Sequence, residues 1–146
     1  MAKANDVPPL RLLAEDAEDL GVMSAALQDG IAKVGDIVYE PATKRLTIAL
    51  NRFRWECPEG GGRVRSALQL GSVLSVKARR IKRDPPDAVV ELLAIEFRPA
   101  DPPGGEVVLS FAGGADLSVE VECIDAVVAD LSSPWPSPNA PRHELS

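Results

Sequence analysis

The chain of 146 residues contains very little histidine and cysteine, and this scarcity excludes several kinds of active site. A Ser-His-Asp or Cys-His centre needs a histidine held rigidly against its nucleophile. The single histidine, His143, lies near the end of a proline-rich stretch, where we expect no rigid packing. A structural zinc site needs four cysteine or histidine ligands, and the chain has three such residues. We therefore expect no catalytic residue, no cofactor and no metal, and the composition argues against an enzyme.

The sequence also lacks features of secreted and membrane proteins. A chain of this length can bury a core of its own, so the two cysteines, Cys57 and Cys123, need not form a disulfide. No apolar leader precedes residue 10. The longest uncharged apolar-rich run, residues 66–76, is too short to span a bilayer. These observations predict a cytoplasmic protein with reduced thiols and no membrane contact.

One helix is expected near the N-terminus, over residues 16–29, after a short extended piece at 10–13. Asp16 can cap its first turn, and Gly30 suits a left-handed stop. Apolar side chains recur along one narrow stripe at Leu20, Met23 and Leu27. This combination of cap, stripe and stop is typical of a surface helix that packs one face on a core.

From residue 31 onward the apolar pattern alternates, as it does in strands. The predicted strands are 34–40, 45–50, 64–70, 72–81, 88–97, 107–111 and 117–123. The run 124–131 fits a helix or a strand that follows a bulge, and the strand is slightly favoured. Because short Pro/Gly turns join the strands, we expect antiparallel pairing. The prediction is an α+β fold in one domain, residues 1–131. It has about seven strands in a highly twisted or barrel-like sheet, a helix on one face or across its open end, and a flexible proline-rich tail at 132–146.

Two hairpins follow from the spacing of the turns. The first, over residues 34–50, places Tyr39 opposite Leu46 and keeps apolar residues on one face. The second, closed by the turn at 84–87, places Arg80 close to Glu91.

The segment that follows the first hairpin contains an irregularity. Leu50 and the apolar residues before it occupy even-numbered positions, whereas Phe53 and Trp55 occupy odd-numbered ones and would point to the other face of the strand. A β-bulge at Asn51 and Arg52 would return both aromatic side chains to the core.

Charge is segregated along the chain. Residues 41–83 contain eleven bases and two acids, whereas the rest of the chain is strongly acidic and the net charge is −6. The candidate residues for binding an anion or a partner are Arg52, Arg54, Arg63, Arg65, Arg79 and Arg80. Pairing of these side chains with acids on neighbouring strands is the favoured interpretation. Binding of a small anion or a protein is second, and the acidic pI of about 4.8 argues against nucleic acid.

Three segments carry a resemblance to a known family: LRLLAEDAEDLGVMSAALQDGIAKVGDIVY, LNRFRWE and FAGGADLSVEVECIDAVVADL. Over residues 9–132 the chain is similar to a family of small bacterial proteins, mainly alphaproteobacterial, described as a domain of unknown function. The resemblance implies a single cytoplasmic bacterial domain. It implies no activity, cofactor or catalytic residue.

The function predicted first is therefore a non-enzymatic binding or interaction module that acts through a protein partner or a homodimer. The alternative is a protein, or an enzyme, that binds a small anionic ligand in a pocket of the sheet. Binding of nucleic acid through the basic middle third is a weaker alternative.

Overall fold

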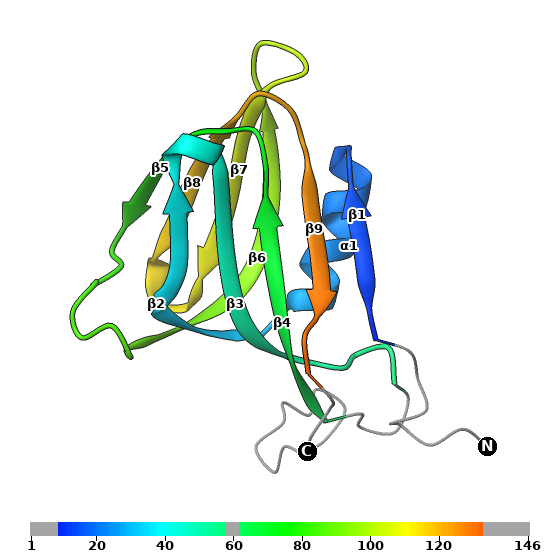
Figure 1. The fold of residues 1–146 in the computed structure, drawn as a ribbon, viewed down its shortest axis with the longest axis vertical. Coiled ribbons are helices and arrows are strands. Elements are labelled where there is room, and N and C mark those ends of the chain that lie inside the picture. The colour runs from blue at the N-terminus through cyan, green and yellow to red at the C-terminus, as the bar shows by residue number, and fades with distance from the viewer. Residues whose placement is uncertain (1–8, 58–61, 133–146) are drawn as a thin grey trace.

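An antiparallel sheet of nine strands and one α-helix make up the described residues, 9–57 and 62–132 of the computed structural model (Figure 1). In chain order the elements are β1 (Arg11–Ala14), α1 (Ala17–Leu27), β2 (Ile31–Glu40), β3 (Arg45–Phe53), β4 (Arg63–Leu70), β5 (Val73–Arg79), β6 (Val89–Pro99), β7 (Gly105–Phe111), β8 (Asp116–Val121) and β9 (Ala126–Asp130). The spatial order of the strands is β1-β9-β4-β3-β2-β6-β7-β8-β5. The predicted α+β class is confirmed. The predicted number of strands is too low, and the sheet is not closed into a barrel.

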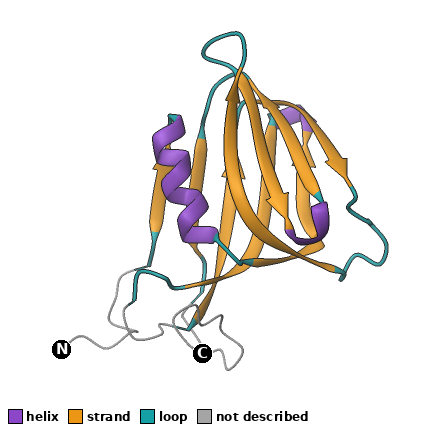
Figure 2. Ribbon diagram, turned by 180° about the vertical axis from the view of Figure 1, so that it is seen from behind, coloured by secondary structure: helices purple, strands orange, loops and turns teal. Residues whose placement is uncertain are grey.

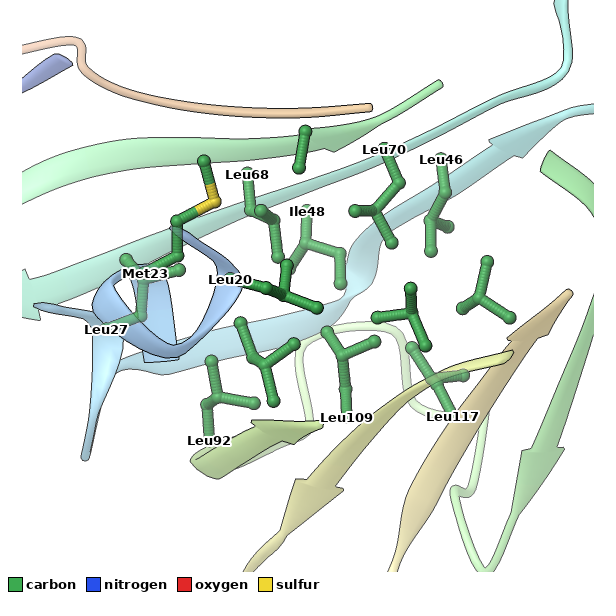
Figure 3. Packing of buried hydrophobic residues seen from close by; sticks show 14 of the residues in the cluster. Leu20, Met23, Leu27, Leu46, Ile48, Leu68, Leu70, Leu92, Leu109 and Leu117 are labelled. Carbon is green, nitrogen blue, oxygen red and sulfur yellow. The ribbon is translucent and has the colours of Figure 1, made fainter. Parts of the chain in front are cut away.

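The two halves of the sheet meet where β2 pairs with β6, and these strands pair over only three residues, Ile31–Lys33 of β2. One half of the sheet contains β1, β9, β4, β3 and β2, and the other contains β6, β7, β8 and β5. Their apolar faces enclose the core, in which Ile48 and Leu68 from one half lie across from Leu109 of the other (Figure 3). The fold is thus two packed layers made from one bent sheet.

Helix α1 fills one opening between the two layers (Figures 2 and 3). The Asp16 carboxylate accepts a hydrogen bond from the Asp19 N–H at 2.8 Å, which caps the first turn as predicted. The predicted stripe points into the core, with exposed fractions of 1% for Leu20 and 0% for Met23 and Leu27. The helix therefore lies across the open end of the sheet, one of the two predicted positions.

The helix does not end as predicted. Asp29, with φ of 65°, adopts the left-handed conformation, and Gly30 does not. Gly30 is instead required for space, since a Cβ there would lie 2.5 Å from Leu50 Cδ1 and 2.9 Å from the Leu27 carbonyl oxygen.

The first predicted hairpin is confirmed, with Tyr39 opposite Leu46 in β2 and β3. The second is wrong, because β5 pairs with β8 and β6 pairs with β2 and β7. Glu91 consequently lies opposite Ile31 and not beside Arg80. The nine residues that link β5 to β6 are long enough to carry the chain from the edge of the sheet to its centre, so the turn at 84–87 closes no hairpin.

The predicted bulge at Asn51 and Arg52 is also wrong. The β3–β4 register runs without a shift as far as Phe53, so Arg52 points inward and Phe53 outward. Phe53 is nevertheless 96% buried, because the Arg63 guanidinium lies 3.8 Å from its ring centroid and the Trp55 ring packs at 5.5 Å. The Trp55 ring and the Arg63 guanidinium therefore bury the Phe53 side chain, in place of the core contact that a bulge would have provided.

The ambiguous run 124–131 contains strand β9, as favoured from the sequence. It does not continue β8 after a bulge, however. Residues 122–125 carry the chain from β8 in one layer to β9 in the other, between β1 and β4 (Figure 1). The tail, with Trp135 and His143, lies outside the described residues.

Both cysteines are free thiols, Cys57 buried and Cys123 half-buried. Among the described residues there is no helix with the length and apolar character needed to cross a membrane.

Candidate functional site

A cavity of about 450 Å³ lies between β2 and β5, at the second opening between the layers. In the described residues, β5 pairs only with β8, and β2 beyond residue 35 pairs only with β3. The remaining edges of β2 and β5 face each other, and the Tyr39 hydroxyl donates a 3.3 Å hydrogen bond to the Leu74 carbonyl across the gap. Figures 1 and 2 show α1 and β5 on opposite sides of the molecule. One opening is thus filled by a helix, and the other is left hollow.

Most of the side chains that line the cavity are apolar, although polar atoms contribute nearly half of its exposed lining. Strands β2, β3, β5 and β8 and the loop after β5 contribute its lining residues, which are Val34, Gly35, Ile37, Tyr39, Leu46, Val76, Ala78, Ile81, Arg83 and Leu117. Among these side chains, the polar groups are the Tyr39 hydroxyl and the Arg83 guanidinium. A volume of this size, lined by mostly apolar side chains and a few polar ones, is typical of small-molecule sites.

The loop of residues 80–88, here called the β5–β6 loop, closes one end of the cavity. Arg80, with φ of 59°, turns the chain out of β5. At the other end, the Val34 and Gly35 N–H groups of β2 donate 2.8 Å hydrogen bonds to the carbonyls of Ala88 and Pro86. These two attachments hold the middle of the loop, with Arg83, against the cavity.

Arg83 is an exposed cation that, within the described residues, makes no ion pair or hydrogen bond. Its guanidinium carries five N–H donors in a planar fork, a geometry that matches a carboxylate. An available cation beside an apolar cavity can bind the acidic head of a ligand whose body lies inside.

Arg52, the first of the candidate arginines, is instead part of a buried network. Its side chain is fully buried, and its N–H groups donate paired hydrogen bonds of 2.7–2.9 Å to Asp130 and to Glu56. Asp130 also accepts from the Ser66 hydroxyl and the Leu10 N–H, each at 2.7 Å. The network joins β3, β4, β9 and the residue before β1.

The pKa values of this network follow from those bonds. Burial alone would lower the pKa of Arg52, but the hydrogen bonds to Glu56 and Asp130 outweigh it and raise the pKa. Burial would raise the pKa of Asp130, but hydrogen bonds from Arg52, Ser66 and Leu10 lower it, and Arg52 likewise lowers the pKa of Glu56. All three groups are therefore held in their charged forms at neutral pH.

The side chains of the other candidate arginines lie in different local environments. Arg54 is buried in the turn after β3, and Arg63 stacks on Phe53. Arg65 donates to Asp36 at 2.9 Å, and Arg79 pairs with Asp116. None of the six candidate arginines lines the cavity.

Arg83 belongs to the same basic third but is not among the six candidate residues. The sequence signal for it is the alternation of apolar Ile81 with Arg83, two residues before the Pro85–Pro86 pair. The hairpin predicted at 84–87 concealed this signal, because it placed the whole segment against Glu91.

A second, shallower hollow of about 290 Å³ lies on the outer face of β5, β7 and β8. Its acids already have partners, since Asp116 pairs with Arg79, and Glu106 forms an ion pair with Arg98 and accepts a hydrogen bond from the Ser118 hydroxyl. This hollow is therefore a weaker candidate than the cavity. Across residues 9–57 and 62–132, no group of three or more His, Cys, Asp or Glu side chains could hold a metal ion.

Comparison with known families agrees with the resemblance noted in the sequence. The model of the family DUF2948, described as a protein of unknown function, matches residues 10–143, so the chain belongs to this family. No curated protein and no solved structure matches the chain.

Proposed function

We propose that this DUF2948 protein is a non-enzymatic binding module for a small amphipathic anion. The apolar body of the ligand enters the cavity between β2 and β5, and its carboxylate pairs with Arg83. The observation that carries the proposal is the combination of a cavity lined mostly by apolar side chains and, beside it, a guanidinium with no ion-pair partner among the described residues.

The chemistry of the wall favours binding over catalysis. Tyr39 and Arg83 supply the polar side-chain groups of the wall, so the lining contains no pair of nucleophile and base. Burial of a ligand's apolar surface contributes about 25 cal/mol per Å². A charge-assisted hydrogen bond from Arg83 adds about 1.5 kcal/mol, which corresponds to about a tenfold preference for an anion over a neutral analogue.

Calorimetric titration with octanoate and with octanol tests this proposal, because the two ligands share a chain and differ in the head group. We expect both to bind and octanoate to bind about tenfold more tightly. Arg83→Gln should abolish the preference while leaving the affinity for octanol unchanged. Ala78→Phe should weaken the binding of both ligands, because the new ring occupies the cavity.

Lys82→Gln is the matched control, since Lys82 is the exposed cation next to Arg83 in the chain and does not line the cavity. It should leave both affinities unchanged. The proposal is wrong if neither ligand binds the wild-type protein, or if Lys82→Gln reduces the preference as much as Arg83→Gln does.

A further inference from the structure

Gly35 of β2 lies directly under the β5–β6 loop, where the two backbones approach closely. Its N–H donates to the Pro86 carbonyl at 2.8 Å. A Cβ at residue 35 would lie 3.0 Å from that carbonyl oxygen and 3.1 Å from Pro86 Cβ. These separations are shorter than ordinary van der Waals contact. Gly35 has no left-handed φ, so a side chain here is opposed by lack of space and not by backbone conformation, and the Pro86 segment must give by a few tenths of an ångström to admit a Cβ.

The loop that Gly35 accommodates is held at both ends. On the β5 side, Ile81 packs against the core cluster. On the β2 side, Pro86 and Ala88 are bonded to the strand. Arg83 lies between these attachments, so a displacement of Pro86 from β2 moves the guanidinium relative to the cavity.

We propose that Gly35 is a positioning residue that sets the preference of the cavity for anions by fixing the place of Arg83. This inference rests on the proposed function, since it concerns how the head group of the same ligand is recognised. Gly35 itself need not touch the ligand head. It acts through the distance between β2 and Pro86.

A graded pair of variants, Gly35→Ala and Gly35→Val, tests this role in the full-length protein. The measured quantity is the ratio of the octanol Kd to the octanoate Kd. From a wild-type ratio of about 10 we expect a two- to threefold fall in Gly35→Ala and a fall to about 1 in Gly35→Val. Because Gly35 itself lines the cavity, an added side chain also changes octanol binding, so the role is read from the ratio of the two Kd values and not from either Kd alone. Should Gly35→Val fail to fold, the fall in Gly35→Ala decides the question.

Two further variants separate positioning from a general loss of structure. Gly35→Ala combined with Arg83→Gln should give the same ratio as Arg83→Gln alone, because the glycine acts only through that arginine. Gly71→Ala is the matched control. A Cβ there would lie 2.5 Å from the Asp125 carboxylate, away from the β5–β6 loop, so the ratio should not change.

The possible results are distinguishable. A wild-type preference that persists in both Gly35 variants overturns this inference and leaves the proposed function standing. Equal weakening of octanol and octanoate also overturns it, because the role would then be structural. Absence of binding of either ligand to the wild-type protein overturns the proposed function, and this inference with it.

Discussion

The two openings between the layers of the sheet are closed in different ways. At one opening, α1 inserts three fully buried side chains, Leu20, Met23 and Leu27. At the other, β2 and β5 leave about 450 Å³ unfilled, although apolar side chains line the space. Protein interiors are normally packed to crystal-like density, whereas the hollow between β2 and β5 is partly open to solvent and so is accessible to a ligand. The filled opening therefore serves the fold, and the hollow one is the place to look for a ligand.

The arginines show the same contrast. Arg52 is fully buried and satisfied by two carboxylates, so it holds strands together and has no capacity left for a ligand. Arg83 is exposed beside the cavity and has no ion-pair partner among the described residues. Positive charge in the sequence does not distinguish these roles, whereas burial and partners do.

The largest effect is expected at the filled opening. Leu20→Ala should lower the free energy of unfolding by about 4 kcal/mol, because it removes a buried side chain and leaves a void in the core. Urea denaturation followed by circular dichroism measures this change. Val22→Ala on the exposed face of the same helix, where the valine is 55% exposed, should cost less than about 1 kcal/mol. Equal losses in the two variants would mean that α1 does not fill the opening.

The next largest effect concerns the buried network. Asp130→Asn should lower the free energy of unfolding by about 3 kcal/mol at pH 7, because Arg52 loses one of its two charged partners. The pKa of Asp130 is lowered in the folded protein from an ordinary value of 3.8. Its contribution is therefore complete above that value and is lost as the pH falls through the lowered pKa. The difference between wild type and variant should shrink below about pH 4.

Asp116→Asn is the control for this comparison, because Asp116 is also paired with an arginine, but Arg79 is largely exposed. We expect a cost below about 1 kcal/mol, as for surface ion pairs in general. A loss similar to that of Asp130→Asn would contradict the distinction between buried and exposed arginines.

The sequence predicted local features well and distant ones poorly. The Asp16 cap, the stripe on α1 and the Tyr39–Leu46 pair each depend on residues within about ten positions, and all are confirmed. The pairing of β5 with β8 and the transfer of the chain to β9 join distant segments, which short-turn rules do not predict. The cavity exists because of these distant pairings. For that reason the sequence pattern points to Arg79 and Arg80 in this run and not to Arg83.

The smallest effect is expected where the cavity itself is filled. Ala78 on the cavity side of β5 lies opposite Leu117 of β8. Ala78→Leu adds about as much side-chain volume as Leu20→Ala removes. The added volume, however, enters the cavity and not the packed core. We expect the free energy of unfolding to rise by less than about 1 kcal/mol, with no overpacking, while the affinity for octanoate falls at least tenfold. Urea denaturation and calorimetric titration of the same preparation measure both quantities. A loss of several kcal/mol would show that this opening is packed like the one filled by α1, and the contrast between the two openings would then disappear.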